Sequence, residues 1–107
     1  LLGLSFKENC PDIRNSKVKT IYHELTEIGC LVDIFDPWVD NNTAKMEYGI
    51  NLIEKIERNY YDAILVCVAH DIFRNMGASE IHSFGREKHI VYDLKYLFLK
   101  SETDLRL

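Results

Sequence analysis

The sequence predicts an α/β fold, a mostly parallel open sheet with helices on both faces. Short apolar runs of strand length alternate along the 107 residues with segments whose apolar residues recur at helical spacing. The run at 63–69 is apolar on both of its faces, as expected of a central parallel strand covered on both sides. Crossovers between parallel strands are right-handed, so we expect three layers in a Rossmann-like arrangement.

The first elements follow from local patterns. Residues 1–6 form a short apolar run that predicts a buried strand. Apolar side chains at helical spacing then predict a helix over residues 16–28, with Ser16 as its N-cap and Gly29 as its stop. Residues 30–35 predict a second strand.

The middle of the chain is less regular. Asp36 and Pro37 end the second strand and are interpreted as a turn, since proline cannot continue a central ladder. A short helix is expected around residues 44–48, and three isoleucines at spacings of three favour another helix over residues 50–59.

The second half again alternates. The strand at 63–69 is followed by one or two short helices over residues 71–84, broken near Gly77. Residues 89–93 predict a last strand, and the polar residues 101–107 are expected to fray.

Two cations near the start point to an anion site. Lys7 follows the first strand and Arg14 precedes the first helix, with a proline-containing loop between them. In open α/β sheets ligands bind beyond the carboxyl ends of the strands, where helix N-termini also favour anions. Each cation has a plainer interpretation: Lys7 as a solvated lysine, and Arg14 as a partner of Asp12, which we expect to brace the loop.

Composition excludes several functions. The net charge of -4 argues against a general nucleic-acid surface, and no apolar run is long enough for a membrane helix. Three widely spaced cysteines make no disulfide framework, so we expect the reducing cytoplasm. Cys30 and Cys67 are expected in the core, and Cys10 is a weaker candidate for a nucleophile.

The remaining candidates carry less specific signals. His70 ends the central strand, at the edge of the sheet where a ligand is expected. One interpretation of this histidine is therefore a role near that ligand. Its spacing to His82 is not that of metal ligands, so no metal site is expected. Phe6 is either a ligand contact or a core aromatic.

Several motifs, in order, resemble one family. Gly3-Leu4-Ser5-Phe6-Lys7 and Asp12-Ile13-Arg14-Asn15-Ser16 resemble the opening of the C-terminal domain of UDP-glucose/GDP-mannose dehydrogenases. The segments Asp36-Pro37, Ala69-His70 and Asp93-Leu94-Lys95 agree with it in order, so the resemblance covers nearly the whole chain. The sequence of residues 6–15 most resembles that of the bacterial UDP-N-acetylhexosamine 6-dehydrogenases of surface polysaccharide synthesis.

The resemblance implies a function and a division of labour. Such enzymes oxidise the C6 alcohol of a UDP-sugar to a carboxylate in two NAD-dependent steps. It implies that Phe6, Lys7 and Lys95 bind the substrate, while Arg14 reaches NAD held mainly by an N-terminal domain. Relatives often carry arginine at the position of Lys95, so lysine there retains the charge but loses the bidentate fork.

The resemblance also implies that residues 1–107 are one nucleotide-sugar-binding domain, a fragment of a larger homodimeric enzyme. The five glycines never take the G-x-G-x-x-G spacing of a dinucleotide site, and no segment matches the one that carries the thiol nucleophile. We therefore expect no catalytic residue here and no activity from the chain alone. The alternatives are a receiver-like signalling domain, which would need an acidic pair after its first strand, and a non-catalytic interaction domain.

Overall fold

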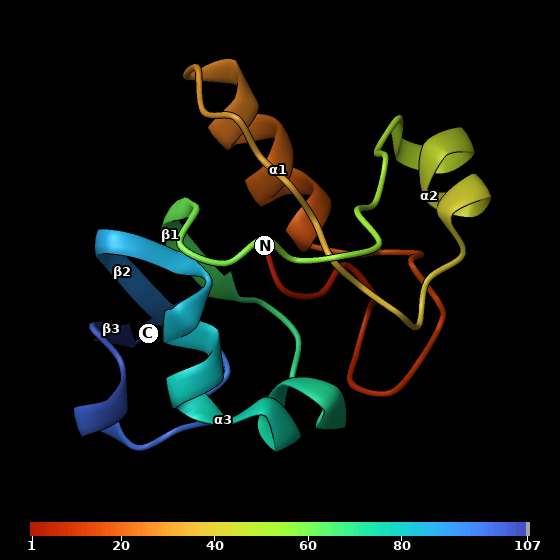
Figure 1. Cartoon of the computed structure of the whole chain (residues 1–107). Coiled ribbons are helices and arrows are strands. Elements are labelled where there is room, and N and C mark those ends of the chain that lie inside the picture. The colour runs from red at the N-terminus through yellow and green to blue at the C-terminus, as the bar shows by residue number, and fades with distance from the viewer. Residues whose placement is uncertain (107) are drawn as a thin grey trace.

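The computed structural model describes residues 1–106 (Figure 1). Its elements follow in this order: α1 (Val18–Glu27), α2 (Asn41–Tyr48), β1 (Tyr61–Val66), α3 (Asp71–Ser83), β2 (Gly85–Asp93), the 3-10 helix η1 (Lys100–Glu102) and β3 (Leu105–Arg106). No helix within these residues has the length and apolar character that crossing a bilayer requires.

The sheet is parallel and extends beyond its named strands. Strands β1, β2 and β3 pair in that order, each parallel to its neighbour. On the other edge of β1 the N-terminal segment pairs through Leu2, which in turn pairs with Phe35. Ile34 then pairs with Leu52, again in parallel. The N-terminal segment therefore lies in the middle of the sheet, between β1 and the segment around Phe35.

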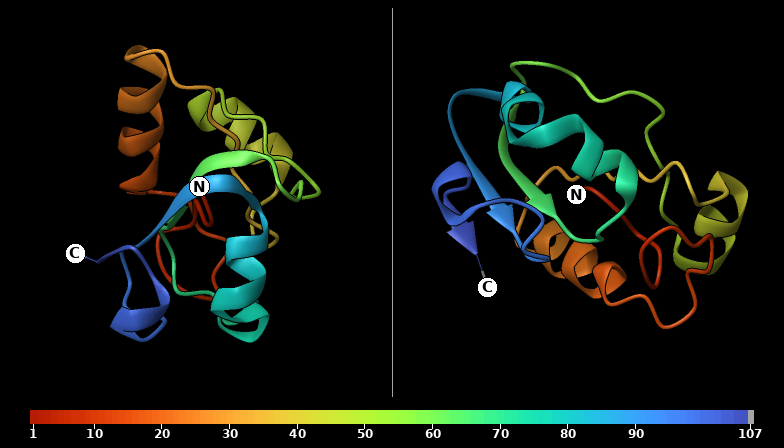
Figure 2. Two further views of the ribbon diagram at one scale, coloured as in Figure 1. Left: turned by 60° about the vertical axis from the view of Figure 1, so that its left-hand side comes forward. Right: turned by 90° about the horizontal axis from the view of Figure 1, so that it is seen from below.

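Two apolar clusters cover the two faces of this sheet. One contains Val18 of α1 and Ala44 of α2. The other contains Phe73 of α3 together with Ile64 and Val66, whose side chains share one face of β1. The views in Figure 2 likewise place α1 and α3 on opposite sides of the strands. The predicted three-layer, Rossmann-like α/β architecture is confirmed.

Most predicted elements are present with shifted bounds. The helix expected over 16–28 is α1, and Gly29 follows its end with a φ of 100°. The strand expected over 63–69 is β1, and the one expected over 89–93 is the second half of β2. Gly77, with φ 81° and ψ 160°, interrupts α3 as predicted.

Four expectations are wrong, and the first three concern a helix, a cysteine and the last residues. Residues 50–59 form no helix, because Leu52 joins the sheet and the segment is extended there. Cys30 is exposed rather than buried, because the second strand pairs only at Ile34 and Phe35. Residues 101–106, expected to fray, contain the end of η1 and all of β3, while Leu107 lies outside the described residues.

Ser16 has a different role from the predicted one. The N-cap of α1 is Lys17, and no side chain caps this helix. The Ser16 hydroxyl instead donates to the backbone oxygen of Leu4 at 2.5 Å, inside the protein. A residue expected to begin a helix thus ties that helix to the N-terminal segment.

Gly3 explains why this segment can pass so close to β1. Its φ of 105° lies in the region that L side chains rarely adopt, and a Cβ there would stand 2.5 Å from the Cβ of Val68. Gly49 also has a positive φ, of 69°, but nothing lies within 4 Å of the place where its Cβ would be.

The two glycines form a matched pair for mutation. We expect Gly49→Ala to lower the free energy of unfolding by about 1–2 kcal/mol, the cost of the left-handed backbone alone. Gly3→Ala adds overpacking against Val68 and should cost about 1–3 kcal/mol more. Urea denaturation of both variants measures the difference, and equal losses would contradict the close packing of Gly3 on Val68.

Candidate functional site

A hollow opens where the parallel segments end. The carboxyl ends of β1 and β2 point to the same edge of the sheet (Figure 2). Ser5 to Lys7 follow the N-terminal segment at this edge, and Cys67 to Ala69 follow β1. The N-terminal segment and β1 are neighbours in the sheet. The segment around Phe35 lies on the far side of the N-terminal segment, and β2 lies on the far side of β1. The hollow therefore lies at the point where the strand order reverses, the usual ligand crevice of such folds.

The hollow has a volume of about 360 Å³ and a cationic lining. It is lined by Ser5, Phe6, Lys7, Glu8, Asn15, Lys17, Val18, Cys67, Val68, Ala69 and Lys95. Three of these residues are lysines and one is acidic. All three lysines are exposed, and none of them takes part in an ion pair within residues 1–106. An anion is the ligand that this lining would attract.

The structure brings together three of the four predicted site residues. Phe6, Lys7 and Lys95 all line the hollow. The ring of Phe6 is 56% exposed, so the alternative of a core aromatic is wrong. Lys17, just before α1, is a lining cation that the sequence analysis missed, although its place one residue after the predicted N-cap was a usable signal.

A buried carboxylate fixes the loop that carries Lys95. Asp93, at the end of β2, is fully buried. Its two oxygens accept from the backbone N–H of Lys95 at 3.1 Å and of Phe98 at 3.0 Å. The turn after β2 is therefore set by the strand itself, which places Lys95 at the rim of the hollow.

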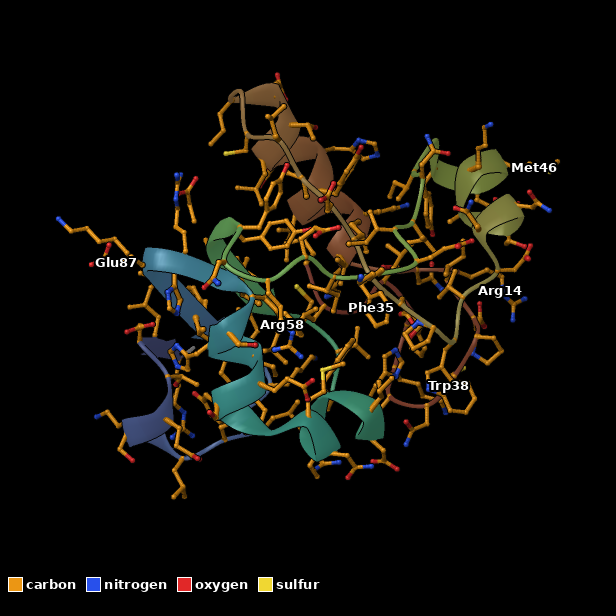
Figure 3. The ribbon with its side chains drawn as sticks, in the orientation of Figure 1. Arg14, Phe35, Trp38, Met46, Arg58 and Glu87 are labelled. Carbon is orange, nitrogen blue, oxygen red and sulfur yellow. The ribbon has the colours of Figure 1, made fainter. Side chains whose placement is uncertain are left out.

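Arg14 lies outside the hollow. Figure 3 shows its side chain pointing outward at the edge of the molecule. Its guanidinium donates to both oxygens of Asp12: Nε lies 3.0 Å from Oδ1 and Nη2 lies 2.8 Å from Oδ2. The hydrogen bonds from Arg14 lower the pKa of Asp12 to about 2.

Asp12 also braces the loop, as expected. Its backbone oxygen accepts from the N–H of Phe6 at 2.7 Å, which closes the loop between the two residues. The plainer interpretation of Arg14, as a partner of Asp12, therefore describes its contacts in this chain.

A second buried carboxylate, that of Asp36, fixes the other loop. Its Oδ2 accepts from the N–H groups of Leu4 at 2.7 Å and Ser5 at 3.0 Å, and lies 3.0 Å from Nε2 of His70. Its Oδ1 accepts from the N–H of Trp38 at 2.9 Å. Both Asp36 and His70 are buried, so the interpretation of Asp36 as only a turn residue is incomplete.

The pKa of Asp36 reflects its surroundings. Burial alone would raise it, but the hydrogen bonds from His70, Leu4 and Ser5 stabilise the charged form. The net result is a pKa below the ordinary value of 3.8. Such a carboxylate stabilises the fold above its unfolded pKa, and this stabilisation is lost as the pH falls through the lower folded pKa.

Metal binding has no support in the described part of the chain. Among residues 1–106, no three side chains of His, Cys, Asp or Glu come together in a group that could hold a metal ion. His70 turns its ring into the protein, toward Asp36.

Asp36→Asn tests the role of this carboxylate in stability. An amide cannot accept from all four donors, because its NH₂ faces at least one of them. We expect a loss of about 1–3 kcal/mol in the free energy of unfolding at neutral pH. Because wild type loses its own Asp36 stabilisation in acid, the gap between the two proteins should narrow below about pH 4.

Urea denaturation between neutral pH and pH 3 measures both effects. Asp62→Asn is the control, because that carboxylate is 81% exposed in its ion pair with Arg86. A gap that is constant over this range would contradict the depressed pKa of Asp36.

Comparison with known proteins gives consistent matches. The model of the UDP-glucose/GDP-mannose dehydrogenase family, UDP binding domain, matches residues 1–100. The whole chain is 48% identical to a UDP-N-acetyl-D-glucosamine 6-dehydrogenase of Salmonella typhi and 50% identical to one of Pseudomonas aeruginosa. It is also 37% identical, over 98% of its length, to Protein CapL of Staphylococcus aureus.

The extent of these matches bears on the function. The chain spans 25% of the length of each of the two dehydrogenases and 24% of Protein CapL. The matches favour the predicted family over the alternatives of a receiver-like signalling domain and a non-catalytic interaction domain. The chain belongs to the UDP-glucose/GDP-mannose dehydrogenase family, as a form of its UDP-binding domain.

Proposed function

We propose that this chain is the UDP-sugar-binding part of an NAD-dependent UDP-sugar 6-dehydrogenase, which oxidises a C6 alcohol to a carboxylate for polysaccharide precursors. The observation that carries the proposal is the gathering of Lys7, Lys17 and Lys95 around one hollow at the reversal point of the sheet. The similarity to two UDP-N-acetyl-D-glucosamine 6-dehydrogenases favours a UDP-N-acetylhexosamine as the sugar nucleotide.

The chemistry of the hollow suits a diphosphate. UDP carries two adjacent phosphates, and three lysines that have no carboxylate partner within residues 1–106 can neutralise them. The volume of about 360 Å³ lies within the range of small-molecule sites. The exposed ring of Phe6 offers an apolar face to the base or the sugar.

In this proposal the residues of the chain bind and orient, and they carry out no chemical step. Lys7 and Lys17 hold the diphosphate from one side, and Lys95 contributes charge from the end of β2. NAD, bound mainly by another domain, supplies the oxidising power. Other domains of a longer chain, and a second copy of it, would complete the active site.

Arg14 fits a role toward NAD rather than UDP. Its guanidinium is exposed and outside the hollow, and its planar fork suits a pyrophosphate. The bidentate pair with Asp12 would keep Arg14 in a fixed direction until another domain presents that ligand. In the complete enzyme, Arg14→Ala is therefore expected to impair the use of NAD.

Replacing one cation in the hollow and one outside it tests the proposal. Lys7→Ala should weaken UDP binding by about ten- to hundred-fold, as expected for the loss of a charge-assisted contact. Isothermal titration of UDP into the chain, at fixed ionic strength, measures this loss.

Arg14→Ala is the matched control, because it removes the same charge from the same loop. It should leave the affinity for UDP unchanged, and both variants should retain the melting temperature of wild type within a few degrees. Equal weakening by the two substitutions would point to general electrostatic attraction and contradict a site at the hollow.

A further inference from the structure

The imidazole of His70 lies between the two segments that form the hollow. It follows Cys67–Ala69, which leave β1 at Val66, it precedes α3, and it is fully buried. The indole of Trp38 stacks on it at 6.2 Å, and the ring of Phe73 lies 5.6 Å away at a tilt. These neighbours hold the ring in one orientation, so its two nitrogens meet different partners.

The partners define which nitrogen carries the proton. Nδ1 lies 2.9 Å from the backbone nitrogen of Asn9. A backbone N–H can only donate, so Nδ1 must be the acceptor and the neutral ring carries its proton on Nε2. Nε2–H then faces Oδ2 of Asp36 at 3.0 Å and the Ser5 hydroxyl at 3.1 Å.

Both sides of the ring lead to the loop that carries Lys7. The Ser5 hydroxyl accepts from Nε2 and donates to the backbone oxygen of Lys7 at 3.0 Å. On the other side, Asn9 is bound to Nδ1 two residues after Lys7. The loop is therefore held before and after Lys7 by one imidazole.

Asn9 makes a second contact, through its side chain, with the residue that follows His70. Its φ of 52° is in the left-handed region, which asparagine tolerates. Its Oδ1 accepts from the N–H of Asp71 at 3.0 Å, in the first turn of α3. The side chain of His70 does not cap α3. The N–H of Asp71 is instead satisfied by Asn9, which lies 62 positions earlier in the sequence.

We propose that His70 is a positioning residue, whose Nδ1 holds the Asn9 end of the loop and so keeps Lys7 at the hollow. The effect on ligand affinity rests on the proposed function, whereas the effect on the loop does not. Nε2 has the separate task of pairing with Asp36, which secures the ends of the sheet segments.

Two substitutions separate the nitrogens. The Oδ1 of asparagine can take the place of Nδ1, so His70→Asn retains an acceptor for the Asn9 N–H. The amide nitrogen of glutamine can take the place of Nε2, so His70→Gln retains the donor to Asp36. A merely structural histidine would make both variants less stable without distinguishing between their loops.

Three measurements on the chain test the proposal. Long-range ¹H–¹⁵N NMR of wild type should show His70 with a protonated Nε2 and an unprotonated Nδ1. Amide hydrogen exchange of Asn9 should be much faster in His70→Gln and nearly unchanged in His70→Asn. Affinity for UDP should fall by about three- to tenfold in His70→Gln and by no more than about twofold in His70→Asn.

His82→Gln, near the C-terminal end of α3, is the control and should leave the Asn9 exchange and the UDP affinity unchanged. A proton on Nδ1 in wild type would overturn the proposal without any variant having to fold. Equal Asn9 exchange in the two His70 variants would overturn it as well. If wild type fails to bind UDP while the exchange rates separate as expected, the proposed function fails and the positioning of the loop stands.

Discussion

The geometry of this domain depends on one buried carboxylate. Asp36 accepts from the ends of two segments, through Leu4 and Ser5 on one side and Trp38 on the other, and it pairs with His70 after β1. A buried charge is tolerated only when it is fully hydrogen-bonded, so these segments must end together. Their common end is the edge of the sheet at which the lysines gather. The hydrogen bonding of Asp36 thus both stabilises the fold and forms the edge at which the proposed site lies.

The cations of the proposed site have no ion-pair partner among residues 1–106. The described ion pairs of the chain involve arginines and one histidine, and the three lysines of the hollow are in none of them. Their side chains are free to meet an anion, while the backbones of Lys7 and Lys95 are held by Ser5 and Asp93. A rigid backbone beneath flexible cations suits a site that must accept a charged ligand from water and release it again.

The sequence alone predicted what depends on local pattern. The fold class, α1, β1 and the break at Gly77 follow from periodicity and from residues with strong backbone preferences. The helix expected over 50–59 is absent because its isoleucines do not share a face: Ile50 belongs to the apolar cluster that contains Ala44 of α2, whereas Ile56 packs against the one that contains Phe73 of α3. An extended chain can contribute side chains to two clusters in this way, and the spacing of the isoleucines alone does not reveal it.

The pairing of Asp36 with His70 joins residues 34 positions apart, so it became visible only in the fold. A motif pointed to Phe6, Lys7 and Lys95, which line the hollow, whereas Lys17, which lines it too, was missed because helix-start lysines are common.

The central claim is that the hollow between the N-terminal loop and the end of β1 is the site for a nucleotide diphosphate. A crystal structure of the chain soaked or grown with UDP tests it most directly. The account predicts density for the diphosphate within hydrogen-bonding distance of Lys7 and at least one of Lys17 and Lys95, with the Ser5–Asn9 loop unchanged. A diphosphate bound beside Arg14, or on another face of the sheet, would contradict it.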